Sequence, residues 1–240
     1  MKACLLLDYC VLYGGAFEDR SWHIVKQTLN NDERIRLDRR IANAEKRTGA
    51  QIVLAVIERS DTYSELPWKA FALGASLAGL SVSVLDLLRP GWTSGIAVLI
   101  AVVLLLAAGA AGALLCVSVP RFARLFLEAH RAEVEVRQYA ESFFLSREVF
   151  ATRRRTGVLL LVSLFERQVV VLPDTGLGQR LSKETLKRII ARMTIVLASG
   201  QVARALEDGL SSLEEVLTVT APGESGENEL ADEIVEEEGQ

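Results

Sequence analysis

Two carboxylate residues, Glu45 and Asp174, are the strongest candidates for a metal-binding pair in this sequence. Thr48 follows Glu45 within the same predicted helix, and Thr156 precedes the pair of apolar runs that leads to Asp174. Carboxylate, hydroxyl and carbonyl oxygens are the hard ligands that Ca2+ or Mg2+ accept in proteins. The pattern therefore predicts a divalent cation at Glu45 and Asp174. Helix capping and turn formation are the alternative interpretation of the same residues.

A second polar group follows the ends of apolar runs. Ser60, Asp61 and Tyr63 come after the first run, and Glu166 and Arg167 lie between two later ones. If these runs are strands, the five side chains emerge at the carboxyl edge of a sheet, where open α/β proteins usually place their sites. The same edge would lead into the long apolar segments described below and would face a membrane. We interpret the group as a polar turn with a Glu-Arg hairpin tip, and an active site is the alternative.

The composition excludes several other kinds of site. The 240 residues include two histidines and three cysteines, which disfavours a zinc site, a His-based catalytic triad and a disulfide scaffold. The sequence contains no P-loop, GxGxxG, GxSxG or HExxH motif. The net charge of −4 provides no basic excess to neutralise phosphates, so we expect no nucleic acid among the partners.

Apolar periodicity predicts the elements that position these side chains. Continuous apolar runs bounded by polar residues indicate buried strands, and apolar residues at helical spacing between a capping residue and a glycine indicate helices. The predicted strands cover residues 51–57, 157–164 and 168–172, and the predicted helices cover 31–49, a long stretch after Pro120, 183–199 and 202–217.

The order of these elements determines the fold class. A helix lies between the first two strands, so these strands should be parallel with a right-handed crossover, whereas a short loop makes the second and third an antiparallel hairpin. The result is an α/β layered domain with a small mixed sheet. Asp174 then returns to the edge of the sheet next to Glu45, and Asp61 lies at the other edge, about 17 Å away.

Two long apolar segments follow the first strand. Residues 92–119 carry no charge over 28 positions, and residues 69–88 are charged only near their ends. About 20 apolar residues span a bilayer as a helix, and the Arg89-Pro90-Gly91 sequence suits a tight turn, so we predict a transmembrane hairpin. Five basic residues flank the hairpin and only Arg89 lies in its turn. The positive-inside rule then places the domain in the cytoplasm.

These predictions divide the chain into four parts. Residues 31–67 and 120–220 form one discontinuous α/β domain, and residues 68–119 form the inserted hairpin. Residues 1–30 combine a basic start with an apolar run that a charge interrupts, so we interpret them as an N-terminal extension or an upstream start choice rather than a signal peptide. The tail 221–240 holds eight carboxylates and no basic residue, and we expect it to be disordered.

The strands and their flanking residues resemble the TPM domain, in particular the membrane-inserted version of that family. The matching segments are 41–53, Tyr63, 155–160 and 165–177. The resemblance implies a Rossmann-like three-layer α/β/α sandwich at a membrane. Members of the family are functionally diverse, since a thylakoid-lumen relative is described as an acid phosphatase and some relatives bind divalent cations.

Two hypotheses for the function follow. The first is a non-catalytic, cation-binding module, integral to the plasma or inner membrane, whose partners are the lipid bilayer and a membrane protein that it recruits or stabilises. The absence of a recognisable nucleophile constellation favours this hypothesis. The second is a weak metal-assisted phosphatase, which is supported by the pair Glu45 and Asp174 and by the family resemblance.

Overall fold

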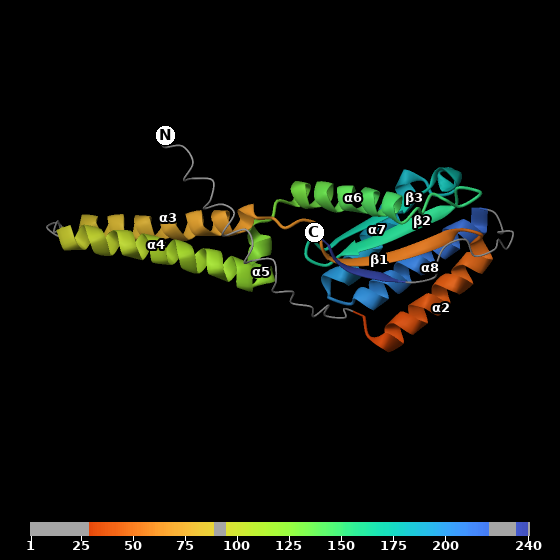
Figure 1. Cartoon of the computed structure of the whole chain (residues 1–240), viewed down its shortest axis with the longest axis horizontal. Coiled ribbons are helices and arrows are strands. Elements are labelled where there is room, and N and C mark those ends of the chain that lie inside the picture. Colours follow the sequence, from red (N-terminus) through yellow and green to blue (C-terminus); the bar gives the residue numbers. More distant parts are fainter. Residues whose placement is uncertain (1–28, 89–94, 221–233, 240) are drawn as a thin grey trace, which may run out of the picture.

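The computed structural model describes residues 29–88, 95–220 and 234–239. The described residues form a mixed α/β structure with four strands and seven α-helices (Figure 1). Most of the predicted N-terminal extension, the predicted hairpin turn and residues 221–233 of the acidic tail lie outside the described residues. The elements are α2 (Asn31–Thr48), β1 (Gln51–Arg59), α3 (Glu65–Leu88), α4 (Gly95–Ser118), α5 (Pro120–Ala123), the 3-10 turn η1 (Arg124–Phe126), α6 (Ala129–Ser146), β2 (Gly157–Ser163), β3 (Gln168–Pro173), the 3-10 turn η2 (Thr175–Leu177), α7 (Lys183–Ala198), α8 (Val202–Thr220) and β4 (Val235–Gly239).

A four-stranded mixed sheet in the order β3-β2-β1-β4 forms the centre of the α/β part. β1 pairs parallel with β2, beginning with Gln51 opposite Gly157, and β2 pairs antiparallel with β3, with Ser163 opposite Gln168. The predicted directions of these three strands are confirmed. β1 lies inside the sheet and is buried on both faces, which explains why its sequence is a continuous apolar run rather than an alternating one.

Helices cover both faces of this sheet (Figure 1). On one face, Met193 of α7 and Leu210 of α8 belong to the same apolar cluster as Leu54 of β1, and α2 contributes to it as well. On the other face, Val136 of α6 belongs to a cluster with Ala55 of β1. Adjacent residues of β1 therefore contribute to different cores, because successive side chains of a strand point to opposite faces.

The helix before β1 is held by its end residues. Asn30 caps α2 in a capping box, in which the Glu33 side chain accepts the Asn30 backbone N–H at 2.9 Å. The sequence prediction placed this cap one residue later, at Asn31. Gly49 ends the helix with a φ of 66°, a left-handed conformation that glycine adopts without steric cost.

The single long helix predicted after Pro120 is wrong. The chain forms α5 and η1, passes through Leu127 in an extended conformation and then begins α6. The physical reason is that the apolar residues of this stretch cover two different surfaces. Phe122 and Phe126 pack in a small cluster around Phe165 beside the hairpin, whereas the apolar residues of α6 cover the sheet.

The prediction that the whole tail 221–240 is disordered is wrong at its C-terminal end. Val235–Gly239 forms β4, which pairs parallel with β1 and completes the sheet on that side. Ile234 precedes the strand and is 0% exposed. Its carbonyl oxygen accepts a hydrogen bond from Nη2 of Arg34 in α2 at 2.8 Å.

Glu237 shows how an acidic strand is accommodated at this position. Its carboxylate accepts hydrogen bonds from the Tyr139 hydroxyl of α6 at 2.9 Å and from Nη2 of Arg147, the residue directly after α6, at 2.6 Å. One buried aliphatic side chain, backbone pairing and a charge-assisted bond together order a segment whose composition alone predicts solvation.

α3 and α4 are each 24 residues long and lie side by side as a hairpin that projects from the α/β part (Figure 1). By length and composition, both are long and apolar enough to cross a membrane. A Cβ added at Gly74 would lie 2.6 Å from the carbonyl oxygen of Ala108, and one added at Gly112 would lie 2.8 Å from that of Ala70. Such close backbone approach at small residues is typical of helices that pack in membranes.

We predict that Ile234→Ala lowers the free energy of unfolding by about 2–5 kcal/mol, because it leaves a cavity where a fully buried side chain stood. Ile195→Ala on α7 is the matched control, because Ile195 is 75% exposed. The control should change the free energy by less than about 0.5 kcal/mol. Urea unfolding of both variants measures the difference, and equal effects would show that β4 does not stabilise the sheet.

Candidate functional site

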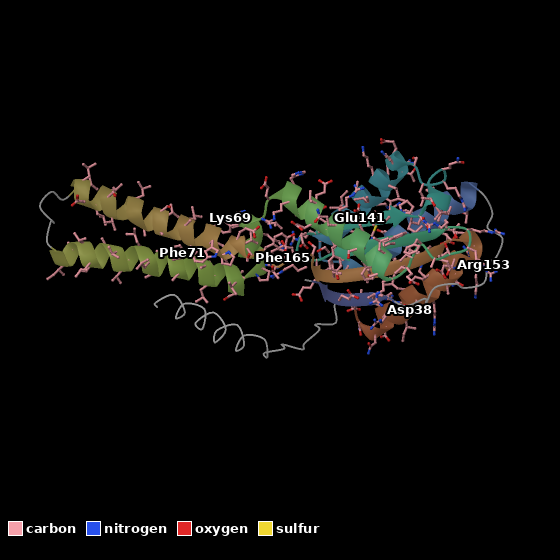
Figure 2. All side chains as sticks on the ribbon, turned by 45° about the horizontal axis from the view of Figure 1, so that its top comes forward. Asp38, Lys69, Phe71, Glu141, Arg153 and Phe165 are labelled. Atoms are coloured by element: carbon pink, nitrogen blue, oxygen red, sulfur yellow. The ribbon has the colours of Figure 1, made fainter. Side chains whose placement is uncertain are left out.

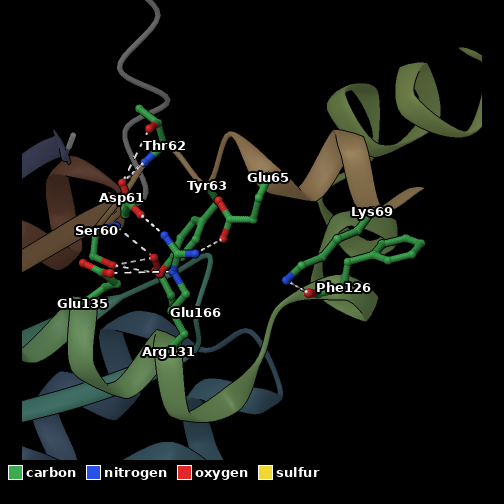
Figure 3. A network of polar contacts seen from close by, with 10 residues as sticks. All are labelled: Ser60, Asp61, Thr62, Tyr63, Glu65, Lys69, Phe126, Arg131, Glu135 and Glu166. Carbon is green, nitrogen blue, oxygen red and sulfur yellow. Dashed lines mark hydrogen bonds and ion pairs between the residues drawn. The ribbon is translucent and has the colours of Figure 1, made fainter. Parts of the chain in front are cut away.

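The carboxyl ends of β1 and β2 gather polar side chains around Glu166, which lies in the turn before β3 (Figure 3). Oε1 of Glu166 accepts hydrogen bonds from the backbone N–H of Ser60 at 2.9 Å and from Oγ of Ser60 at 2.6 Å. Oγ of Ser163 donates to Oε2 of the same carboxylate. All three residues are buried, so protein donors replace the water that a free carboxylate would bind.

Tyr63 closes this group on the side of the hairpin. Its hydroxyl lies 3.2 Å from Oγ of Ser60, and the centroid of its ring lies 5.7 Å from that of Phe165. Burial raises the pKa of Tyr63 far above its ordinary value, and although the Ser60 hydrogen bond lowers it, the Glu166 carboxylate raises it further. The phenol is therefore protonated at physiological pH and serves as a hydrogen-bonding group rather than a base.

Arg131 of α6 connects the same region to the first turn of α3 (Figure 3). Its guanidinium nitrogens lie 2.6 Å from Oε1 of Glu65, 3.4 Å from Oδ2 of Asp61 and 3.7 Å from Oε1 of Glu135. Its Cζ lies 5.9 Å from the centroid of the Tyr63 ring. A single side chain thus joins the loop after β1, the hairpin and the helix that covers the sheet.

This arrangement is suited to joining elements rather than to covalent catalysis. The two hydroxyl groups beside the Glu166 carboxylate belong to Ser60 and Ser163, which are 4% and 0% exposed. A nucleophile must reach the bound substrate, and these hydroxyls are covered. Arg167, which the sequence also placed at this edge, is exposed in the hairpin turn with a φ of 55°.

The strand register brings the chain segments around Glu45 and Asp174 to the opposite edge of the sheet. The Gln51 backbone N–H donates to the carbonyl of Thr156 at 3.1 Å, and the Asp174 N–H donates to the carbonyl of Gly157 at 2.8 Å. The Thr48 hydroxyl, by contrast, donates back to the carbonyl of Ala44 within α2.

Each predicted metal ligand has other partners at this edge. Oε1 of Glu45 accepts the Ile52 N–H at 2.7 Å. Oδ1 of Asp174 accepts the Thr175 N–H at 2.6 Å, and its Oδ2 lies 3.2 Å from Nε of Arg155. An arginine therefore supplies the positive charge beside Asp174. Within the described ranges there is no group of three or more His, Cys, Asp or Glu residues that could hold a metal ion. The cation site stays a prediction, and these contacts do not fit it.

Arg131 and Ser163 were not identified from the sequence. Ser163 could have been identified from the sequence, because a polar residue at the end of a strand buried on both faces requires a buried partner. Arg131 could not, because it is one of many charged residues of α6 and its partner Asp61 lies 70 positions away along the chain.

A polar pocket of about 400 Å³ adjoins the edge of the sheet at which β1 ends, next to Ser60. Ser60, Glu135, Tyr139 and Glu237 are among its lining residues, so α6 and β4 both contribute to it. Burial, and then the hydrogen bond to Glu237, raise the pKa of Tyr139 to about 12. The hydroxyl and carboxylate groups of this lining suit a polar ligand or a polar side chain of a partner rather than an apolar one.

A comparison with known protein families gives a match to one segment of the chain, and that segment contains most of these residues. The model of the TPM domain, whose full name includes the word phosphatase, matches residues 114–216. This segment is similar to the TPM domain. The match spans α5 to most of α8 and leaves β1 outside, so the predicted resemblance is confirmed for this segment. Membership of a membrane-inserted subgroup stays a prediction.

One solved structure supports the fold of the whole chain. The NMR structure of the BA42 protein from the psychrophilic bacterium Bizionia argentinensis superimposes with a TM-score of 0.52 and 14% sequence identity, over 87% of this chain and 94% of that chain. At this identity the similarity shows the fold alone. No protein with a curated description matches the chain.

We predict that Glu166→Gln lowers the free energy of unfolding by about 1–3 kcal/mol, because the amide cannot accept all three hydrogen bonds and leaves buried donors unpaired. Glu141→Gln is the control, because that carboxylate is exposed and pairs only with Arg137 on the same helix. Thermal unfolding of the full chain in detergent measures both, and an unchanged melting temperature in Glu166→Gln would exclude a stabilising role for this carboxylate.

Proposed function

We propose that this chain is a membrane-anchored TPM domain that works as a non-catalytic interaction module, held at the bilayer surface by a transmembrane hairpin formed by α3 and α4. The partner in this proposal is another membrane protein. The observation that carries the proposal is the exposure of the two apolar helices, since most of the exposed large apolar side chains among the described residues belong to α3 and α4.

The apolar side chains of α3 and α4 face outward. Leu80 is 63% exposed, Leu99 is 66% exposed and Leu114 is 68% exposed. Each apolar side chain left in water forgoes roughly 1.5–3 kcal/mol of burial free energy. A helix of 24 residues is about 36 Å long, which exceeds the hydrocarbon thickness of about 30 Å. A bilayer is therefore the environment that these helices favour.

Basic residues support an orientation for this hairpin. Arg59, Lys69, Arg121, Arg124 and Arg131 lie in the chain on either side of the two helices, next to the α/β part. Under the positive-inside rule this distribution favours a plasma or inner membrane location with the TPM domain in the cytoplasm. A Rossmann-like sandwich interrupted by a transmembrane hairpin would then have its carboxyl edge against the membrane.

The covered hydroxyls at that edge support the non-catalytic part of the proposal. The hydroxyls of Ser60 and Ser163 donate hydrogen bonds to the Glu166 carboxylate. Arg131 packs over the ring of Tyr63 and thereby connects this group to the hairpin. Such a connection fixes the domain relative to the membrane helices. It thereby orients the polar pocket beside α6 and β4 toward proteins in the same membrane.

The membrane proposal predicts that the full chain stays in the membrane pellet after alkaline carbonate extraction. In a cysteine-free background, Arg89→Cys should react with an impermeant maleimide added to intact cells, because the hairpin turn would lie outside. Glu148→Cys, an exposed position after α6, should react only after permeabilisation. Release by carbonate would overturn the anchoring, and labelling of Glu148→Cys alone would reverse the orientation.

A metal-assisted phosphatase is the second candidate, and the name of the matched family is the observation that favours it. Under our proposal, the purified full chain with Ca2+ or Mg2+ should not hydrolyse p-nitrophenyl phosphate faster than its Glu45→Ala variant. Cation-dependent turnover that is lost in Glu45→Ala but kept in Glu141→Ala would support the phosphatase instead.

The same preparations test the predicted cation site. A cation bound only by the folded state raises the melting temperature by mass action. If Glu45 and Asp174 bind one, Asp174→Asn should abolish that increase and Asp61→Asn, at the opposite edge, should keep it. No increase in the wild type would leave Asp174 with its structural contacts to Arg155 and Thr175 and without a cation.

A further inference from the structure

Two arginines lie against the ring of Phe165, which Figure 2 shows at the end of the α/β part that meets the hairpin. Cζ of Arg59, at the end of β1, lies 4.7 Å from the centroid of the Phe165 ring, and Cζ of Arg124, in η1, lies 5.7 Å from it. Arg121 in α5 and Arg167 in the β2–β3 turn lie close enough to Arg124 to repel its charge, and we call these four residues the Phe165 arginine cluster. Its members come from four different elements that only the folded chain brings together.

The charges of this cluster are offset only in part, by the buried carboxylate of Glu166. None of the four arginines forms an ion pair with an Asp or Glu among residues 29–88, 95–220 and 234–239. Burial lowers the pKa of Arg124, and repulsion from Arg167 and Arg121 lowers it further, against the opposing effect of Glu166. Glu166 is one carboxylate beside four arginines and already accepts hydrogen bonds from Ser60 and Ser163, so the excess positive charge favours binding of an anion.

One donor of the cluster is buried without an acceptor. Nε of Arg124 has no hydrogen-bond partner within the part of the chain that the structure describes. A buried donor without a partner carries a desolvation penalty that a bound anion would remove. Guanidinium groups bind phosphate through paired, charge-assisted hydrogen bonds, which makes a phosphate oxygen the matching acceptor.

The position of the cluster indicates where such a phosphate comes from. Arg121 and Arg124 follow α4 directly, and Lys69 near the start of α3 places its Nζ 3.4 Å from the carbonyl oxygen of Phe126, beside the cluster. Figure 2 shows Lys69 and Phe165 together where the hairpin joins the α/β part. If the hairpin spans a bilayer, this junction lies at the level of the phosphates of the adjacent leaflet.

We infer that the Phe165 arginine cluster is a binding site for the phosphate group of an anionic phospholipid in the leaflet next to the TPM domain. The inference rests on the proposed membrane anchoring. The lipid phosphate bridges the arginines from β1, the β2–β3 turn and the segment after α4. It thereby fixes the edge of the sheet to the membrane surface and makes the stability of the domain depend on the lipid headgroup.

The test uses the full chain in mixed micelles that contain either phosphatidylglycerol or phosphatidylcholine. Phosphatidylglycerol should raise the melting temperature in a saturable way, and phosphatidylcholine should not. The double variant Arg121→Gln/Arg167→Gln changes two exposed side chains, so it should fold. It should need about tenfold more phosphatidylglycerol to reach half of the maximal increase in melting temperature. The double variant Arg36→Gln/Arg39→Gln removes the same charge from the exposed face of α2 and should behave as the wild type.

Three results would overturn the inference. Equal stabilisation by both lipids would show that no anionic headgroup is recognised, and equal losses in both double variants would show general surface electrostatics. Stabilisation by inorganic phosphate in phosphatidylcholine micelles, equal to that by phosphatidylglycerol, would assign the site to free phosphate. Carbonate extraction distinguishes failure of the lipid site from failure of the proposed membrane anchoring. If the chain stays in the pellet but shows no lipid preference, only the lipid site is rejected.

Discussion

Parallel hydrogen bonding between β1 and β2 is the constraint on which the rest of the structure depends. The two strands pair residue by residue from Gln51 opposite Gly157 to Ile57 opposite Ser163, although the whole hairpin lies between them in the sequence. Because the strands are parallel, α6 must run back along the sheet between the hairpin and β2, and this crossover leaves both ends of the hairpin at the edge where β1 ends, where Arg131 of α6 contacts Glu65 of α3. The hairpin can therefore leave the domain and return to it without opening the core.

The polar contacts at that edge follow from the same constraint. Where β1 ends, the chain turns toward the hairpin of α3 and α4, and the backbone N–H of Ser60 donates to a side chain instead of to a neighbouring strand. Glu166 from the neighbouring turn accepts this N–H, and Arg131 holds the start of α3 from the opposite side. The boundary between the sheet and the hairpin thus combines these polar contacts with the apolar cluster in which Phe165 packs with Leu66 of α3 and Cys116 of α4.

The parts of this fold that the sequence predicts are those governed by local periodicity. The continuous apolar runs predicted β1, β2 and β3 with their directions, and the charge-free helices were evident from composition. β4 was missed because its order depends on long-range contacts, namely the pairing with β1 and the bonds from α6 to Glu237. The break after Phe126 was missed because the apolar residues before and after it follow one helical spacing in the sequence, although they pack against two different surfaces. At the candidate sites, the sequence placed Glu166 and Asp174 at opposite edges, but not Arg131 or Arg155, because the partners of an arginine are set by packing rather than by spacing.

The central place of β1 has a consequence for synthesis. β1 leaves the ribosome before the hairpin, while both of its neighbours, β2 and β4, are made only after the hairpin is complete. Under the proposed anchoring, β1 has two unpaired edges while the hairpin inserts into the membrane, and such an apolar strand is a template for aggregation. Slow insertion should therefore lower the yield of folded protein more than it lowers the stability of the finished domain.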